Sequence, residues 1–384
     1  MTTTTPTAHG LEGEWTTPDW PPITHDFARR VVAHYPALGD ALKILTVSPR
    51  PFSSASLVLT GAGAVFLKRH SMLIRTPHEL EEEHRFLAHL AAQNFPVPRV
   101  LRDSQGRSAI EVENWTCEIQ SVPEGLDLYR DAISWTPFTS IAHASSAGEL
   151  LGRFHLAAQN FSAPPRDTRH LVSSFTIFSA PAPLAALKQF LASRPRLRAY
   201  LKATGWTREA FTLLAPFHAR LSPLLPALGS QWTHNDWHAS NLLWSNSTSG
   251  AHAVATIDFG LADRATALHD LTLAIERNAI GWLSLGKISP LPMHIDHARA
   301  LIAGYASTRP FTRAEAAALA PMLALAHAEF ALSEADYFLA VLNSESKARL
   351  AVEGYLLGHA RWFASNEGST FLNAIEEAAL GNAR

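Results

Sequence analysis

The sequence predicts an α+β protein in which a five-stranded antiparallel sheet with one helix precedes a larger, mainly helical region. Short β-prone runs fill residues 44–122, and the connections between them are too short for a parallel crossover. Helical periodicity then dominates residues 142–379. Of the 384 residues, 47% are hydrophobic and 17% charged, so the apolar side chains suffice for one large or two modest cores.

Local signals place the elements of the first region. Residues 1–23 are predicted to form a flexible tail, and the apolar spacing of residues 24–35 predicts a helix capped by its first residue. A second, amphipathic helix covers 77–94, between the third and fourth strands. The strands are predicted over 44–47, 57–60, 64–69, 108–112 and 116–122.

A Pro-Glu-Gly turn at 123–125 separates an N-terminal lobe, 24–123, from a C-terminal lobe, 124–384. One β-prone island, 241–259, interrupts the helices of the second lobe. The polar turn 245–250 divides this island into a β-hairpin. The helices are predicted over 142–160, 183–192, 208–221 and much of 265–379.

The overall charge and the thiol content exclude several classes of protein. Lys and Arg total 32 against 34 Asp and Glu, so the chain has no basic field to hold nucleic acid or anionic lipid. The single Cys117 suits a reducing compartment, and we expect a cytoplasmic protein. Residues 1–20 lack the features of an export signal. The apolar region 314–331 contains two Glu, a Pro and a His, so we expect no membrane span.

The hairpin and the loop before it carry polar residues that point to chemistry. In an antiparallel hairpin the residue that enters the first strand lies beside the residue that leaves the second, so we expect Asn241 and Asp258 to meet. Amide and carboxylate oxygens at one point suit Mg²⁺, which substrate phosphates complete. Asp236, on the same loop, can accept or orient the proton of an attacking hydroxyl. The three residues together fit phosphoryl transfer.

A lysine at the end of a predicted strand supplies the cation that nucleotide phosphates need. Lys68 is the candidate to bind the α- and β-phosphates, and Glu83 on the following helix is the candidate to fix its ammonium. The adjacent Glu81 and Glu82 are alternatives. Glu83 is preferred because it lies nearest to the apolar face of that helix.

These motifs, taken in order, resemble those of the aminoglycoside phosphotransferase and choline kinase superfamily. The resemblance rests on the His-x-Asp-x4-Asn loop at 234–241, the Ile-Asp-Phe-Gly run at 257–260, the later His-Asp-Leu at 269–271 and the strand lysine. It covers roughly residues 25–365. It implies a protein-kinase-like two-lobe fold, with ATP or another nucleoside triphosphate and Mg²⁺ as cofactors.

The same resemblance implies an enzyme that transfers the γ-phosphoryl group to a hydroxyl of a small molecule, such as an aminoglycoside, an amino alcohol, homoserine or a sugar. It assigns the catalytic base to Asp236 and metal binding to Asn241 and Asp258. Asp270 matches the position that braces the catalytic loop. Asn235 stands where many members have Gly, and Asn also tolerates left-handed backbone geometry.

Two further nucleotide contacts are expected from the fold that the resemblance implies. The run 52–56 lacks the Gly-x-Gly-x-x-Gly of protein kinases, so its phosphate cover rests on serine hydroxyls, Ser54 among them, and on backbone amides. The strand 118–122 offers backbone groups to adenine, at Gln120 and Val122. An ordinary edge strand is compatible with the same residues.

Several acidic and histidine residues have both a functional and a plain interpretation. Glu329 and Asp336 are seven residues apart on one helix face, where an acidic stripe would suit a cationic acceptor, although a solvated polar face explains them as well. His234 and His238 could share a metal only within a helix. Their loop favours His234 as a brace of the catalytic loop and His238 as an ordinary loop residue.

Two other functions compete with a small-molecule kinase. A non-catalytic, nucleotide-binding pseudokinase with a regulatory role is the first, and the full set of catalytic residues argues against it. A histidine-rich metalloprotein is the second, because the chain has 19 His. The acceptor, the choice between ATP and GTP, the oligomeric state, and a role in resistance or in metabolism stay open.

Overall fold

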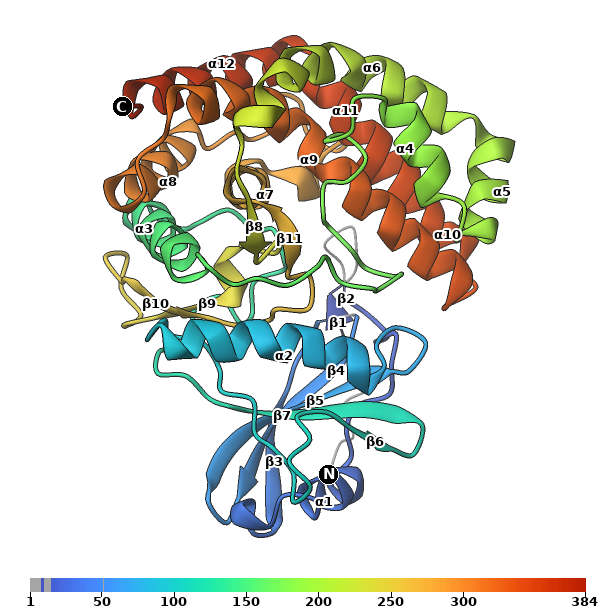
Figure 1. The fold of residues 1–384 in the computed structure, drawn as a ribbon, viewed down its shortest axis with the longest axis vertical. Coiled ribbons are helices and arrows are strands. Elements are labelled where there is room, and N and C mark those ends of the chain that lie inside the picture. The colour runs from blue at the N-terminus through green and yellow to red at the C-terminus, as the bar shows by residue number, and fades with distance from the viewer. Residues whose placement is uncertain (1–7, 10–14, 51) are drawn as a thin grey trace. The chain divides into compact units, whose positions relative to one another are not determined.

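The computed structural model describes residues 8–9, 15–50 and 52–384 (Figure 1). The chain divides into two compact units. The first comprises Met1–Glu124 and Arg166–Thr168, and the second comprises Gly125–Pro165 and Arg169–Arg384. Much of the predicted tail and residue 51 lie outside the described residues.

The first unit contains the predicted five-stranded sheet, in which every neighbouring pair is antiparallel and the order is β3-β4-β5-β7-β6. The strands are β3 (Ala41–Val47), β4 (Ser54–Thr60), β5 (Gly63–Ser71), β6 (Ile110–Val112) and β7 (Trp115–Ser121). The other elements are β1 (Ala8–His9), β2 (Trp15–Thr16), α1 (His25–Val32), the 3₁₀ turn η1 (Pro36–Leu38) and α2 (Pro77–Ala92). The α+β fold class with one helix between the third and fourth strands is confirmed.

Helix α1 begins where the sequence predicts. The Thr24 hydroxyl accepts a hydrogen bond from the Phe27 amide, as an N-cap does, and the apolar face of the helix joins the core of the sheet. The end of the predicted tail also packs on this unit. Ile23 is buried, and the Pro21 carbonyl accepts hydrogen bonds from Ser54 and Arg69. The prediction of a tail up to residue 23 was therefore too long.

The second unit is mainly helical and is organised around α9 (Figure 1). Helices α5, α6, α7, α10 and α12 all pack against it. By length and composition α9 could cross a membrane, but 94% of its apolar window is buried inside the protein. The α-helices are α3 (Ile141–Ala157), α4 (Pro183–Phe190), α5 (Pro195–Thr204), α6 (Trp206–Leu221), α7 (Ala267–Ala279), α8 (Ile295–Thr308), α9 (Arg313–Ala340), α10 (Glu345–Arg349), α11 (Gly358–Phe363) and α12 (Asn366–Gly381). Short 3₁₀ segments are η2 (Ser222–Ala227), η3 (Ala239–Asn241) and η4 (Trp282–Ser284), and η5 (Leu350–Leu357) is a π-helix.

Two small sheets hold the loop that carries the predicted chemistry. The hairpin of β9 (Leu242–Trp244) and β10 (Ala253–Thr256) confirms the predicted one. A second pair, β8 (Ser230–Thr233) and β11 (Asp263–Thr266), was not predicted. The hairpin fixes the end of the 234–241 loop and the start of the 257–262 segment. The pair of β8 and β11 fixes the other two ends, because β8 precedes the loop and β11 follows the segment.

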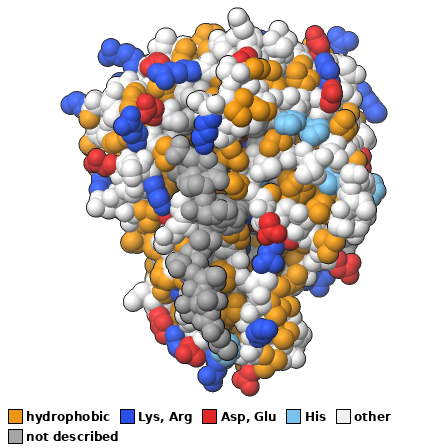
Figure 2. All heavy atoms as spheres, turned by 180° about the vertical axis from the view of Figure 1, so that it is seen from behind, with side chains coloured by type: hydrophobic (Ala, Val, Ile, Leu, Met, Phe, Trp, Pro, Cys, Tyr) orange, Lys and Arg blue, Asp and Glu red, His pale blue; other side chains and the backbone are white. Residues whose placement is uncertain are grey.

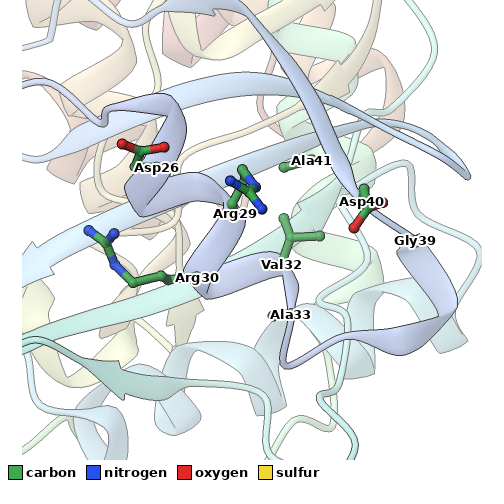
Figure 3. A pocket seen from close by; sticks show the side chains of 8 residues that line it. All are labelled: Asp26, Arg29, Arg30, Val32, Ala33, Gly39, Asp40 and Ala41. Atoms are coloured by element: carbon green, nitrogen blue, oxygen red, sulfur yellow. The ribbon is translucent and has the colours of Figure 1, made fainter.

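The surface reflects the nearly balanced charge of the chain. On the face in Figure 2, basic and acidic side chains are interspersed. An open groove of about 480 Å³ lies on the first unit (Figure 3). It is lined by Asp26, Arg29, Arg30, Val32, Ala33, Gly39, Asp40 and Ala41. None of the predicted site residues lines this groove, so it has no part in the candidate site.

Candidate active site

The loop between β8 and η3 brings Asp236 and Asn241 into direct contact. The Asn241 amide nitrogen donates to the Asp236 backbone carbonyl at 2.9 Å and to its carboxylate at 3.0 Å. The Asn241 carbonyl in turn accepts the Ile257 amide at 2.9 Å, which places Asp258 one residue further along the chain. The Asp236 and Asn241 side chains are therefore bonded to each other, and a backbone hydrogen bond ties the residue before Asp258 to the same loop.

The donor set at this point fits Mg²⁺. Because the amide nitrogen of Asn241 is committed to Asp236, its amide oxygen is the atom left for a hard cation. Asp258 adopts a φ of 62°, in the left-handed region that Asp tolerates better than most residues. Its carboxylate oxygens have the same hard character, and its role in metal binding stays a prediction. Nucleotide phosphates would complete such a coordination shell.

An arginine that the sequence analysis missed pairs with Asp236. Arg277 of α7 donates to the Asp236 carboxylate and, at 3.1 Å, to the Asn235 carbonyl. Burial alone would raise the pKa of Asp236, but the charges of Arg277 and His238 outweigh it, and the pKa lies well below the ordinary value. Asp236 is therefore ionised at neutral pH.

The guanidinium of Arg277 is held in a wholly buried position. It lies 5.5 Å from the ring centroid of Trp135 and 5.3 Å from that of Phe330. Aromatic faces stabilise a cation that has lost its hydration. One signal in the sequence could have found this residue, because Glu276-Arg277 directly follows the apolar run 273–275 of a predicted helix, and buried charges are paired or functional.

Asp270 braces the loop from the first turn of α7, as the resemblance implies. Its carboxylate accepts the amides of His234 and Asn235 at 2.8 and 2.9 Å and the Nε2 of His155 at 3.1 Å. Burial would raise the pKa of Asp270, but the His155 hydrogen bond and the neighbouring charges bring it below the ordinary value. The φ of Asn235 is 60°, the left-handed geometry expected at this position.

The two loop histidines have distinct contacts. The His234 ring accepts the Asp236 amide at 3.2 Å through Nδ1 and lies 3.0 Å from the Ile257 carbonyl through Nε2. It thus joins the loop to the segment that precedes Asp258. His238 was interpreted as an ordinary loop residue, but its Nε2 lies 3.6 Å from the Asp236 carboxylate. Loop context hid this contact from the sequence analysis.

In the first unit, Lys68 lies on β5 directly opposite Glu118 on β7. Glu118 is wholly buried, and its carboxylate is bonded to His70 at 3.0 Å, to His84 at 2.9 Å and to Gln120 at 2.6 Å. Burial would raise the pKa of Glu118, but these histidines and the charge of Lys68 hold it well below the ordinary value. Gln120, predicted as an adenine contact, uses its side chain inside this network.

The other predicted nucleotide residues of the first unit have different surroundings. Glu83 is buried on α2, and its carboxylate lies 3.5 Å from the Arg166 guanidinium. Its pairing with Lys68 stays a prediction. The Ser54 hydroxyl donates to the Pro21 carbonyl at 2.7 Å, so the expectation that this hydroxyl covers phosphates needs correction. Val122 follows β7 and is 40% exposed.

The acidic pair on α9 also needs correction. Glu329 accepts hydrogen bonds from the amides of Ser174 and Ile177 and from the Thr176 hydroxyl, at 2.8–3.0 Å. Asp336 is paired with a histidine and two arginines, as described in the Discussion. Both carboxylates are buried and face residues 169–177 and Arg194 of the same unit, so they form neither a solvated face nor an open acidic stripe. Among residues 8–9, 15–50 and 52–384, no group of three His, Cys, Asp or Glu could hold a metal ion, which gives no support to a histidine-rich metalloprotein.

Comparison with known proteins decides the family. Residues 49–311, more than half of the chain, match the phosphotransferase enzyme family. The chain belongs to this family. The predicted resemblance and the predicted phosphotransferase activity are thereby confirmed.

Several relatives carry kinase names. A homoserine kinase of Pseudomonas aeruginosa is 28% identical over 249 residues, which cover 64% of this chain and 66% of that one. A homoserine kinase of Methylobacillus glycogenes is 24% identical over 302 residues, which cover 77% and 80% of the two chains. An uncharacterized protein of Deinococcus radiodurans is 26% identical over 289 residues, covering 72% of each chain.

Solved structures confirm the kinase-like fold of this family. A microcompartment-associated aminopropanol kinase aligns with a TM-score of 0.59 at 20% identity, covering 89% of this chain and 98% of that one. An amicoumacin kinase in complex with AMP-PNP and Ca²⁺ aligns with a TM-score of 0.54 at 11% identity, covering 91% and 92%.

Proposed function

We propose that the protein is an ATP-dependent kinase that transfers the γ-phosphoryl group to a hydroxyl of a small molecule, with Mg²⁺ as cofactor. The observation that carries this proposal is the assembly of Asp236, Asn241 and the segment before Asp258 on one braced loop. Family membership supports phosphoryl transfer, and relatives named as kinases of homoserine and aminopropanol support a small alcohol as acceptor.

In this proposal Asp236 positions the acceptor hydroxyl and receives its proton. Because Arg277 and Asn241 fix the carboxylate from two sides, little reorganisation is needed when the hydroxyl arrives. A carboxylate with a lowered pKa is a weak base, so its main contribution is orientation, which suits the loose transition state of phosphoryl transfer. Mg²⁺ held by Asn241 and Asp258 would neutralise charge on the phosphates.

The nucleotide contacts of the first unit complete the proposal. Lys68 binds the α- and β-phosphates, and Glu83 fixes its ammonium. Glu118, on the strand opposite Lys68, adds a second buried negative charge to the surroundings of this lysine. The backbone around Gln120 and Val122 receives adenine.

Replacing the proposed base tests this function. We expect purified protein with ATP and Mg²⁺ to phosphorylate at least one alcohol in a panel of amino alcohols, hydroxy amino acids, sugars and aminoglycosides. The Asp236→Asn variant should lose about 10²- to 10⁴-fold in kcat and still bind nucleotide. Asp296→Asn, at a side chain 78% exposed on α8, is the matched control and should keep its activity. Nucleotide binding without turnover of any alcohol by the unmodified protein would favour the pseudokinase instead.

A further inference from the structure

Directly behind the proposed base, five polar residues from four elements form one buried group. Glu276 and Arg277 come from α7, His327 from α9, Tyr355 from η5 and His359 from α11. None is more than 6% exposed. We call these five residues the α7 polar cluster. Arg277 joins the cluster to the loop, because one of its nitrogens is bonded to the Asp236 carboxylate.

The cluster contains polar atoms that no described residue satisfies. Buried polar atoms in proteins nearly always have hydrogen-bond partners, and a buried polar atom without one costs about 1–3 kcal/mol. Arg277 and Tyr355 share a side-chain hydrogen bond. Within the described residues, the atoms of the cluster without a partner include both Glu276 carboxylate oxygens, Arg277 Nε, His327 Nδ1 and His359 Nδ1. So many orphaned atoms in one place, next to the proposed base, point to a polar ligand.

The contacts within the cluster do not account for the Glu276 carboxylate. Arg277 Nε lies 3.9 Å from Oε2, beyond hydrogen-bond distance. His359 Nδ1 lies 3.0 Å from Oε1 but without hydrogen-bond alignment, and it is held by stacking on Trp282 at 3.5 Å. Burial lowers the pKa of His359 well below its ordinary value, so this imidazole is neutral and supplies no counter-charge.

When Glu276 is ionised, its carboxylate has no charged donor among the described residues within hydrogen-bond distance. Arg277 and His238 both face Asp236, and the approach of Arg277 to Glu276 is 3.9 Å. The two histidines of the cluster are neutral, since burial lowers the pKa of His327 to about 3 and that of His359 well below its ordinary value. A buried carboxylate in these surroundings favours a ligand with a cationic donor. Aromatic rings beside the cluster, Trp135 at 4.9 Å from Tyr355 among them, suit a cation as well.

We propose that the α7 polar cluster recognises the acceptor, and that Glu276 binds an ammonium group of the alcohol whose hydroxyl Asp236 positions. The acceptor class is therefore an amino alcohol rather than a neutral sugar or diol. This inference rests on the proposed function. The Arg277 guanidinium contacts the Asp236 carboxylate and lies 3.9 Å from the Glu276 carboxylate, so both carboxylates lie beside the same side chain.

Matched pairs of alcohols that differ in the amine test this class. The pairs are 1-amino-2-propanol with 1,2-propanediol, homoserine with 4-hydroxybutyrate, and glucosamine with glucose. ATP turnover and calorimetric binding are measured for each with the full-length protein. We expect an amine to be turned over and bound at least about tenfold better than its partner, as a charge-assisted hydrogen bond predicts.

Two glutamine variants separate recognition from a structural role. Glu276→Gln should raise KM for the amine at least about tenfold, leave the neutral partner unaffected and not lower the midpoint of thermal unfolding. Glu329→Gln is the control, because Glu329 is equally buried but fully hydrogen-bonded. It should lower the unfolding midpoint and leave the KM for the amine unchanged.

The outcomes distinguish this inference from the function on which it rests. Equal turnover of amines and neutral alcohols overturns the amine site and leaves the kinase intact. If no alcohol is turned over, the proposed function is overturned, and the binding data decide whether the amine site exists. Amine binding that is abolished in Glu276→Gln supports the site. Absence of binding for every amine overturns the site. A loss of stability in Glu276→Gln without a change in KM also overturns it.

Discussion

Two buried glutamates in the second unit differ in whether their carboxylate oxygens have hydrogen-bond partners. Glu329 of α9 accepts three hydrogen bonds, whereas Glu276 of α7 accepts none from the described residues. Both side chains are buried in the same helical core. The comparison teaches that burial of a carboxylate does not by itself mark a functional site; the informative feature is whether its oxygens have partners.

The partners of the α9 acidic residues explain their role. Asp336 lies 2.9 Å from His170, 3.5 Å from Arg169 and 3.6 Å from Arg194, which are ion-pair contacts without hydrogen-bond alignment. Glu329 binds residues 174–177. The two carboxylates therefore fasten the 169–177 segment to α9. The α7 side chains instead face the catalytic loop and one another.

Replacing Arg277 should have the largest effect on the α7 side of this comparison. Arg277→Met leaves the Asp236 carboxylate without its guanidinium, so the base loses its fixed position. We expect kcat to fall by about 10- to 100-fold, with Arg277→Lys intermediate because an ammonium cannot reproduce the planar contacts. Steady-state kinetics of the two variants measure this. Unchanged kcat in Arg277→Met would mean that the pairing does not position the base.

Asp270→Asn tests whether the brace of the loop is also a structural element. The amide cannot accept both backbone N–H groups and the imidazole as the carboxylate does. We expect the free energy of unfolding to fall by about 2–3 kcal/mol, measured by urea titration, and kcat to fall as well. A variant as stable as the parent would show that the loop holds itself without Asp270.

A smaller loss is expected when a satisfied carboxylate on α9 is altered. In Glu329→Gln an amide NH₂ group replaces one carboxylate oxygen and would face hydrogen-bond donors. The free energy of unfolding should therefore fall by about 1–2 kcal/mol. Urea titration measures this free energy. The kcat of the variant is the control and should stay unchanged. If kcat falls while stability does not, the original expectation of an acidic substrate stripe on α9 regains support.

The smallest effect concerns the pH dependence of stability. Burial raises the pKa of Glu276 from 4.5 to about 7, and the opposing charge of Arg277 offsets only part of this. Between these values the folded protein holds a proton that the unfolded chain has released, so rising pH favours unfolding. His359 and Tyr355, which also face Glu276, keep their neutral forms in this range. Glu276→Gln should therefore gain stability relative to the parent as pH rises from 4.5 to 7. Curves of unfolding free energy against pH that run parallel for the parent and Glu276→Gln would contradict this.

The sequence was sufficient where spacing alone carries the chemistry. The order of Asp236, Asn241 and Asp258 predicted the hairpin and the assembly at its open end, because polar residues at fixed intervals on a loop need no tertiary information. The short β-prone runs and the short connections between them likewise predicted the five-stranded antiparallel sheet. The pair of β8 and β11 escaped prediction because residues 234–262 separate its two strands, so no short turn between them marks a hairpin.

Tertiary contacts explain what could not be predicted. Arg277 and Glu276 acquire their partners from α9, η5 and α11, which lie far away in the sequence. The interpretation of Glu329 as part of a solvated or substrate-facing acidic face was an avoidable error. Helix α9 is apolar on every face, and a helix of that kind is buried, so Glu329 had to find its partners inside the protein. The Ser54 hydroxyl donates a hydrogen bond to the Pro21 carbonyl, which lies far away in the sequence, so no local pattern could predict this contact.

Phosphorus NMR of the reaction tests the central claim most directly. The protein is incubated with ATP, Mg²⁺ and the amino alcohol that the panel identifies, and the γ-phosphorus is followed over time. The account predicts a new phosphomonoester resonance that grows as ATP is converted to ADP, and its loss in Asp236→Asn. Release of the γ-phosphoryl group as inorganic phosphate alone, or equal ester formation by Asp236→Asn, would contradict the account.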